Sequence, residues 1–218
     1  NQYRGERMQT YDENDALPNN IVWSILTDKE NNLWMGTNNG LAKITFSYTA
    51  HGKIEHRNIT TFTMANGLPS NVIYSLYEDS KGNIWAGTGI NGAAVMTKGS
   101  GRFTAYNSNN GLGSDIVYSI TEDRDGNIWF GTKGGATKFV QSTGQFRNYT
   151  IADGLGGNHV YRIFRDSKDN LWIGSLGGAL CVFDGFSFKK YDESAGLVHK
   201  FILSINEDKK GNIWFGCY

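Results

Sequence analysis

Short apolar segments recur along the chain at a nearly constant spacing. Each is seven or eight residues long, mixes β-branched, aromatic and aliphatic residues, and ends in an aspartate. Segments of this length and composition are typical of β-strands and too short for helices. They are IVWSILTD (21–28), VIYSLYED (72–79), IVYSITED (116–123), VYRIFRD (160–166) and FILSINED (201–208).

A tryptophan strand follows each of these segments in phrases such as GNIWFG. The tryptophans are Trp34, Trp85, Trp129, Trp172 and Trp214, in steps of 51, 44, 43 and 42 residues. A period of this size fits the four-stranded blade of a β-propeller better than a shorter helical repeat. The first step is longer, and its surplus around residues 47–57 predicts an enlarged loop or hairpin tip.

Turn chemistry separates the predicted strands. Asp-Gly or Lys-Gly pairs precede the tryptophan strand and paired Gly or Asn residues follow it, as tight hairpins require. A third strand comes next, and a fourth is expected at 146–149 in the third repeat. No stretch predicts a convincing helix, so the fold class is all-β with antiparallel up-and-down blades.

The two ends of the chain complement one another in this frame. The chain begins inside a predicted third strand and ends just past a predicted second strand. Two strands from each end would complete one blade through backbone hydrogen bonds alone. We therefore predict one domain over residues 1–218, a closed five-bladed β-propeller whose last blade joins N-terminal and C-terminal strands and leaves no exposed sheet edge.

The repeated residues are expected to be structural. A tryptophan at the same place in each blade would fill the wedge between neighbouring sheets, so we assign all five to the core. DRDGN (123–127) offers alternate oxygens that could form a calcium loop. A hairpin turn is the preferred interpretation, because the sister segments differ and no glutamate occupies the twelfth position.

Composition excludes several classes of function. The chain has 21 basic and 21 acidic residues and no basic run, which gives little support to binding of nucleic acid or of anionic membrane surfaces. No apolar run is long enough to cross a bilayer, so we expect no membrane insertion, and no signal-peptide pattern is present. Cys181 and Cys217 fall at non-equivalent points of different blades, which argues against a disulfide. No metal-ligand spacing appears, and we expect no cofactor and no metal.

The phrase GLPSNVIYSLYEDSKGNIWAGT (67–88), with relatives at 111–132 and 154–175, resembles the two-component regulator propeller repeat. The resemblance covers essentially the whole chain. It implies the sensor region of a bacterial hybrid two-component system, a periplasmic or secreted location, and a glycan ligand. The propeller also resembles the streptogramin lyases more distantly, but His51, His56, His159 and His199 lack the spacing with Glu that their chemistry uses.

Two sets of side chains are candidates for a site near the axial channel. One is polar and lies eight residues before each repeated aspartate; the other is mostly aromatic and lies five before it. Aromatic faces beside amides and carboxylates suit sugars. The default interpretation is that the aromatics pack between blades and the amides cap turns, because strand register does not show which side chains face the channel. The polar set is Asn20, Asn71, Asp115, Asn158 and Lys200; the aromatic set is Trp23, Tyr74, Tyr118, Tyr161 and Leu203.

Arg162 is the sharpest departure from the repeat, because the other blades have serine at this position. A buried cation needs a carboxylate, water or an anionic ligand. We hypothesise an axial pocket for an acidic or neutral oligosaccharide formed by Arg162, Asn158, Tyr161 and Lys200, with Asn71, Asp115 and Tyr118 as further candidates. The alternative is an internal ion pair with a neighbouring acid such as Asp115 or Glu122.

Three functions remain open. The favoured one is a non-catalytic sensor-type module that binds a carbohydrate or another small polar ligand at the axial mouth. The second is an engineered or fragment-derived scaffold without a ligand, which predicts uniform blades and a channel filled by its own side chains. The third is a lyase-like enzyme, which predicts an acid and a base converging on one mouth, and no such constellation is visible in the sequence.

Overall fold

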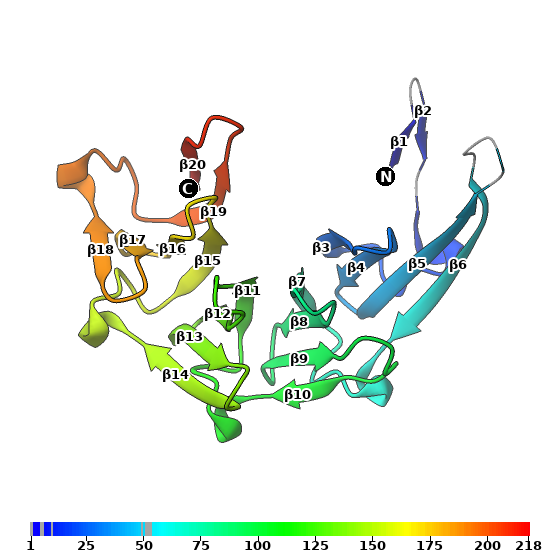
Figure 1. The fold of residues 1–218 in the computed structure, drawn as a ribbon. Coiled ribbons are helices and arrows are strands. Elements are labelled where there is room, and N and C mark those ends of the chain that lie inside the picture. The colour runs from blue at the N-terminus through cyan, green and yellow to red at the C-terminus, as the bar shows by residue number, and fades with distance from the viewer. Residues whose placement is uncertain (1, 5–6, 10, 49, 51–53) are drawn as a thin grey trace.

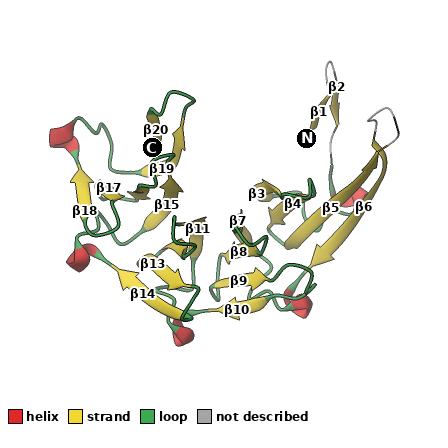
Figure 2. Cartoon of the chain, in the orientation of Figure 1, coloured by secondary structure: helices red, strands yellow, loops and turns green. Residues whose placement is uncertain are grey.

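The computed structural model describes residues 2–4, 7–9, 11–48, 50 and 54–218. Its strands form successive antiparallel sheets arranged as an arc, with short connections between them (Figures 1 and 2). The first complete blade consists of β3 (Val22–Thr27), β4 (Leu33–Thr37), β5 (Gly40–Tyr48) and β6 (Ile54–Phe62). The second consists of β7 (Ile73–Glu78), β8 (Ile84–Thr88), β9 (Ala93–Met96) and β10 (Thr104–Tyr106).

Two more complete blades follow with the same strand order. The third consists of β11 (Val117–Glu122), β12 (Ile128–Thr132), β13 (Gly135–Val140) and β14 (Gln145–Tyr149). The fourth consists of β15 (Val160–Arg165), β16 (Leu171–Ser175), β17 (Leu180–Phe183) and β18 (Phe188–Tyr191). The predicted all-β fold and its four-stranded antiparallel blades are confirmed.

The fifth repeat contributes β19 (Ile202–Glu207) and β20 (Ile213–Cys217), and the N-terminal part contributes β1 (Gln2–Arg4) and β2 (Arg7–Gln9). The prediction of two strands at each end is confirmed, but the predicted closure is wrong. β1 pairs with β2 and β19 pairs with β20, and no described strand of one end pairs with the other. The N and C labels lie on opposite arms of the arc (Figure 1). A count of strands shows that each end supplies two of them, but it does not fix the angle between successive blades and so does not show whether the two ends meet.

The long first step of the repeat is a long hairpin, as predicted. β5 and β6 pair from Leu41 with Phe62 to Tyr48 with Ile54, and they are the longest strands of the described chain. Residues 49 and 51–53 of the predicted tip lie outside the described residues.

Five short 3₁₀ helices, which the sequence analysis did not predict, lead from each outer strand toward the next inner strand. A polar residue caps the start of each: Thr63, for example, accepts a hydrogen bond from the N–H of Ala65 and begins a capping box. Gly67 ends this helix with a φ of 96°, a left-handed conformation that favours glycine. The helices are η1 (Glu13–Asp15), η2 (Met64–Asn66), η3 (Ser108–Asn110), η4 (Ile151–Asp153) and η5 (Glu193–Ala195).

The core lies between blades, and the tryptophans form much of it. Trp129, on the third blade, is fully buried against Val160, Ile163 and Ile173 of the fourth blade. Trp34 and Trp85 pack on the second and third blades in the same way. The core assignment is therefore confirmed for these three.

The last two tryptophans differ. Trp172 is only partly buried against β19 and β20, and Trp214 is 65% exposed, which corrects its assignment to the core. The reason is that a tryptophan is covered by the blade that follows it, and no described blade follows β20.

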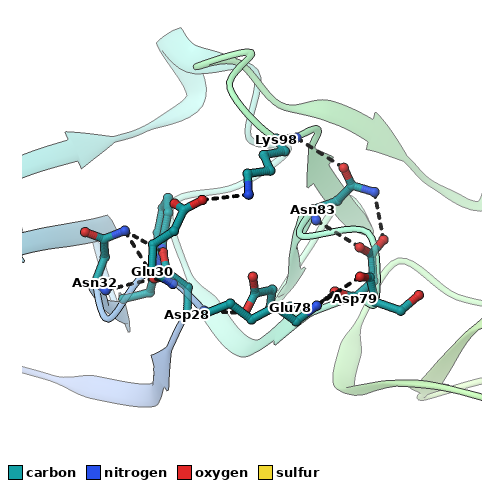
Figure 3. A network of polar contacts seen from close by, with 10 residues as sticks. Asp28, Glu30, Asn32, Glu78, Asp79, Asn83 and Lys98 are labelled. Carbon is teal, nitrogen blue, oxygen red and sulfur yellow. Dashed lines mark hydrogen bonds and ion pairs between the residues drawn. The ribbon is translucent and has the colours of Figure 1, made fainter.

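DRDGN forms a hairpin turn, as preferred. Asp123 accepts hydrogen bonds from the backbone N–H groups of Asp125 (3.0 Å) and Asn127 (2.9 Å), so its carboxylate is used within the turn. Neighbouring turns are joined: Lys98 on the second blade pairs with Glu30 on the first at 2.7 Å, and Lys98 N donates to Asn83 Oδ1 (Figure 3). Cys181 is buried and Cys217 exposed, and both are free thiols.

Candidate ligand-binding site

A β-bulge in the inner strand of every repeat positions the predicted aromatic set. In β11, Val117 lies opposite Thr132 and Ser119 lies opposite Gly131, so Tyr118 is an extra residue with no partner on β12. A bulge of this kind bends the strand and changes the direction of the extra side chain. The same irregularity occurs in the other inner strands, and the extra residues there are Trp23, Tyr74, Tyr161 and Leu203.

These five bulged residues and Arg162 line one pocket of about 290 Å³. The rings of Tyr74 and Tyr118 stack with their centroids 5.9 Å apart, and those of Tyr118 and Tyr161 stack at 4.9 Å. Trp23 meets Tyr74 edge to face at 5.4 Å. An aromatic row therefore follows the inner strands from the first blade to the fourth.

The surroundings of Tyr118 in this row change its pKa. Burial raises the pKa of Tyr118 above its ordinary value, and the nearby phenols of Tyr74 and Tyr161 raise it further. Tyr118 therefore stays protonated at neutral pH and can donate a hydrogen bond into the pocket. No carboxylate and no side-chain amide belongs to the lining.

Arg162 is the one charged residue of the lining. It lies opposite Gly174 in the register of β15 and β16, at the place where β11 has Ser119. Ser119 accepts a hydrogen bond from the N–H of Ile163 at 3.0 Å and thereby links the third blade to the fourth. Arg162 makes no hydrogen bond or ion pair with any residue that the structure describes. Its side chain is reached by solvent, yet the surrounding protein desolvates it and lowers its pKa.

The alternative of an internal ion pair is not what the structure shows. Asp115 accepts a hydrogen bond from the N–H of Ser108 at 2.7 Å. Glu122 accepts from the backbone N–H and the hydroxyl of Ser80, at 2.7 and 2.6 Å. Both acids are therefore committed elsewhere, and Arg162 pairs with neither.

The polar set lies outside the lining of this pocket. Asn158 Oδ1 accepts a hydrogen bond from the N–H of Ile151 at 2.8 Å, at the first residue of η4. Asn71 Oδ1 accepts the equivalent hydrogen bond from the N–H of Met64 at 3.0 Å, and Asp115 accepts it from the N–H of Ser108. These residues fix the turn that enters each inner strand, so the capping interpretation holds for them. Their part in ligand binding stays a prediction.

Lys200 occupies the equivalent position in the fifth repeat, where a lysine cannot accept a hydrogen bond. Its ammonium instead lies 3.5 Å from Glu193 Oε1, in η5. Lys200 is thus paired and lies outside the lining, whereas Tyr118, Tyr161 and Arg162 are brought together in it.

His159 is a further feature that the sequence analysis did not connect with the pocket. Its ring lies 5.1 Å from that of Tyr118, and its Nε2 atom is buried without a hydrogen-bond partner. Burial lowers the pKa of His159, and the charge of Lys133 lowers it further, so the ring is neutral at pH 7. The signal was available, because the equivalent residues in the other repeats are all apolar: Ile21, Val72, Ile116 and Phe201.

A model of the two component regulator propeller family matches five segments that together make up more than half of the chain: 16–39, 67–89, 111–134, 154–177 and 196–218. The chain belongs to this family. The matched segments of this two component regulator propeller run from the residues after each 3₁₀ helix through the bulged inner strand to the tryptophan strand, so they include the pocket residues.

Solved structures agree with this assignment. The extracellular domain assigned to the hybrid two component system BT3049 from B. thetaiotaomicron is 29% identical over 90% of this chain, with a TM-score of 0.73. That of BT4673 from the same organism is 22% identical over 91% of this chain, with a TM-score of 0.74. The chain spans only about a quarter of the length of these two neighbours, 26% and 28%.

A third neighbour is an enzyme. A catalytically inactive virginiamycin B lyase from Staphylococcus aureus, solved with quinupristin, is 19% identical over 89% of this chain and 62% of its own, with a TM-score of 0.66. At this identity the likeness shows the propeller fold alone. No curated protein matches the chain. Within the described part of the chain, no helix is long and apolar enough to span a bilayer, and no group of three or more His, Cys, Asp or Glu residues is arranged to hold a metal.

Proposed function

We propose that this two component regulator propeller is a non-catalytic, ligand-binding part of an extracellular or periplasmic sensor, and that it binds an oligosaccharide or another small polar ligand in the aromatic pocket. The observation that carries the proposal is the row of bulged aromatic residues that converge on one pocket. The pocket, at about 290 Å³, is at the small end of the ~300–1,000 Å³ range of ligand sites, which fits a few sugar units or a smaller molecule.

Aromatic rings suit carbohydrates because the C–H faces of a sugar pack on them, while phenol hydroxyls form hydrogen bonds with the sugar hydroxyls. The pocket is open and not filled by its own side chains, unlike the channel expected of a ligand-free scaffold. The extracellular neighbours BT3049 and BT4673 support a location outside the cytoplasm.

The test is a thermal-shift screen against neutral and acidic oligosaccharides. A ligand that binds only the folded protein at 100 times its Kd stabilises it by about 2.7 kcal/mol, which for a chain of this size raises the Tm by roughly 5–10 °C. Tyr118→Leu keeps the apolar bulk but removes the central ring of the row, and it should abolish the shift. Phe186→Ala, which changes an aromatic side chain that is 91% exposed and outside the pocket, should leave the shift intact.

Two results would contradict the proposal. A panel that produces no shift in the wild-type protein supports the scaffold interpretation. Formation of a cleaved or eliminated product from a bound ligand supports the lyase-like interpretation, and chromatography of the incubated panel checks for it.

A further inference from the structure

The fourth blade departs from the other blades at three positions in and directly before β15, each three residues from the next. Arg162 lies where the other four repeats have serine, and Arg165 lies where most of them have glutamate. His159 lies where the others have an apolar residue. Arg165 is satisfied within its own turn, because its Nε donates to Asp169 Oδ1 at 2.8 Å. Arg162 is therefore the arginine of this strand that lacks a partner among the described residues.

The acids around Arg162 are already used. Glu207 accepts hydrogen bonds from the N–H and hydroxyl of Ser167, at 2.7 and 2.6 Å. Asp166 accepts from the indole N–H of Trp172 at 2.8 Å, and Asp169 pairs with Arg165. A second hollow, of about 600 Å³, is lined by Arg162 together with these three acids. Arg162 therefore lines both hollows, yet no described carboxylate pairs with it.

Arg162 is exposed to solvent in these hollows, and because no described carboxylate pairs with it, its guanidinium is free to pair with an anion that enters. Retaining an arginine in place of a serine makes physical sense if a ligand supplies the missing negative charge. The rest of the lining agrees with this, since it consists of three phenols, an indole and an aliphatic side chain. Such a pocket offers hydrogen-bond donors and a positive charge but no carboxylate or amide, so it favours a ligand group that accepts hydrogen bonds.

We infer that the ligand of this pocket carries an oxyanion, such as the carboxylate of a uronic acid or a sugar sulfate, and that Arg162 binds it while the rings of Tyr118 and Tyr161 contact the adjoining sugar. The planar fork of arginine can donate two parallel hydrogen bonds to such a group. This inference rests on the proposed function and narrows it from carbohydrates in general to acidic ones.

The test compares trigalacturonate with its fully methyl-esterified form by isothermal titration calorimetry. The two probes share rings and hydroxyls and differ in charge. Wild-type protein should bind trigalacturonate at least tenfold more tightly than the ester, because a hydrogen-bonded charge is worth about one order of magnitude or more in affinity. A sulfated galactose disaccharide and its unsulfated form make a second pair, which tells carboxylate from sulfate as the preferred oxyanion.

Arg162→Ser is the sharpest variant, because serine is the residue at this position in the other four repeats. It should abolish the preference for the charged probe. Arg162→Lys keeps the charge and should retain part of the preference. Arg124→Ser removes the same charge from a turn side chain that is 61% exposed and outside the pocket, and it should leave the preference for the charged probe unchanged.

Each outcome separates the inference from the proposed function. Equal affinity for a charged probe and its neutral form, unchanged by Arg162→Ser, would overturn the inference and leave carbohydrate binding standing. The same holds if a neutral oligosaccharide of the panel binds while both charged probes do not. If none of the neutral or acidic oligosaccharides binds, the proposed function fails and the inference fails with it.

Discussion

The indole Nε1 of Trp129 donates a hydrogen bond of 2.9 Å to Asp123 Oδ2, six residues earlier in the chain. The other carboxylate oxygen, Oδ1, accepts from the backbone N–H of Asn127, so Asp123 fixes the turn and the core side chain together. The same pair recurs in all five repeats, with Asp–Trp distances between 2.8 and 3.1 Å. This explains the constant spacing of aspartate and tryptophan.

The first prediction concerns this pair. Asp123→Ala leaves the buried indole N–H of Trp129 without an acceptor and removes the hydrogen bonds of the turn. We expect the free energy of unfolding to fall by about 2–4 kcal/mol, measured by urea denaturation. Asp208→Ala is the matched control, because the same pair there is exposed, and it should destabilise the protein clearly less. Equal losses at both sites would show that the turn alone, and not the buried indole, sets the cost.

The second prediction concerns acid. Burial alone would raise the pKa of Asp123, but hydrogen bonds from Trp129, Lys138 and Asn127 outweigh it and hold the pKa below the ordinary value of about 3.9. Burial also acts to raise the pKa values of Asp28 and Asp166, but hydrogen bonds from the tryptophan and asparagine of each turn outweigh it and lower them. As the pH falls, the unfolded chain therefore binds protons before the folded protein does, and this contribution to stability is lost.

We expect the urea midpoint to fall progressively from about pH 5 downward, continuing through the lowered pKa values of the folded state. Asp123→Asn keeps an oxygen acceptor but cannot titrate there, so its midpoint should depend less steeply on pH in this range. A wild-type midpoint that stays constant from pH 6 to pH 3 would contradict the role given to these carboxylates.

The third prediction separates covered from uncovered tryptophans. Trp129→Ala should cost about 3–5 kcal/mol, since this side chain is fully buried between two blades. Trp214→Ala changes a side chain that is 65% exposed and should cost about 1 kcal/mol or less. Chemical denaturation of both variants measures the difference. A large loss at Trp214 would mean that another surface covers it in solution.

This contrast shows what could be predicted from the sequence. The period places Trp214 in the same strand as Trp129, but its environment depends on whether a following blade lies against it. The repeat itself identified Arg162, because a position that breaks the pattern stands out against four serines. Whether the ring closes was not predictable, because the repeat pattern gives the number of strands but not the angle between successive sheets.

The aromatic row shows the other limit. Tyr118 and Tyr161, two of the predicted site residues, line the pocket. Strand alternation could not show that they face it, because a bulge at each changes the direction of the side chain. The capping role that the sequence analysis preferred for Asn71 and Asn158 agrees with their contacts. Each accepts a hydrogen bond from the backbone N–H seven residues earlier, and this spacing recurs in four repeats.

In most pairs of neighbouring blades, a glutamate at the end of one inner strand accepts a hydrogen bond from the turn of the preceding blade. The fourth blade lacks this glutamate. Glu78 accepts from the N–H of Lys29 at 2.8 Å, beside the turn network of Figure 3, and Glu122 accepts from Ser80 at 2.7 Å. In the fourth blade Arg165 takes this position and pairs with Asp169, so among the described residues no such carboxylate reaches the turn of the third blade. Asp169 has a φ of 69°, in the left-handed region that glycine occupies at the equivalent position of three other turns.

The last prediction is that Arg165→Glu combined with Asp169→Gly stabilises the protein. The new glutamate can accept a hydrogen bond from the backbone N–H of Arg124, as the glutamates at the equivalent position of other blades do. The glycine adopts the left-handed backbone conformation without strain, and it also removes the Asp169 carboxylate, which would otherwise repel the new one. We expect a gain of about 1–2 kcal/mol and a rise in Tm of roughly 2–8 °C, measured by calorimetry. Arg165→Glu alone should gain less, because Asp169 is then left beside a like charge. A double variant with a lower Tm than the wild type would show that the Arg165–Asp169 pair stabilises this blade more than the inter-blade carboxylate does in the others.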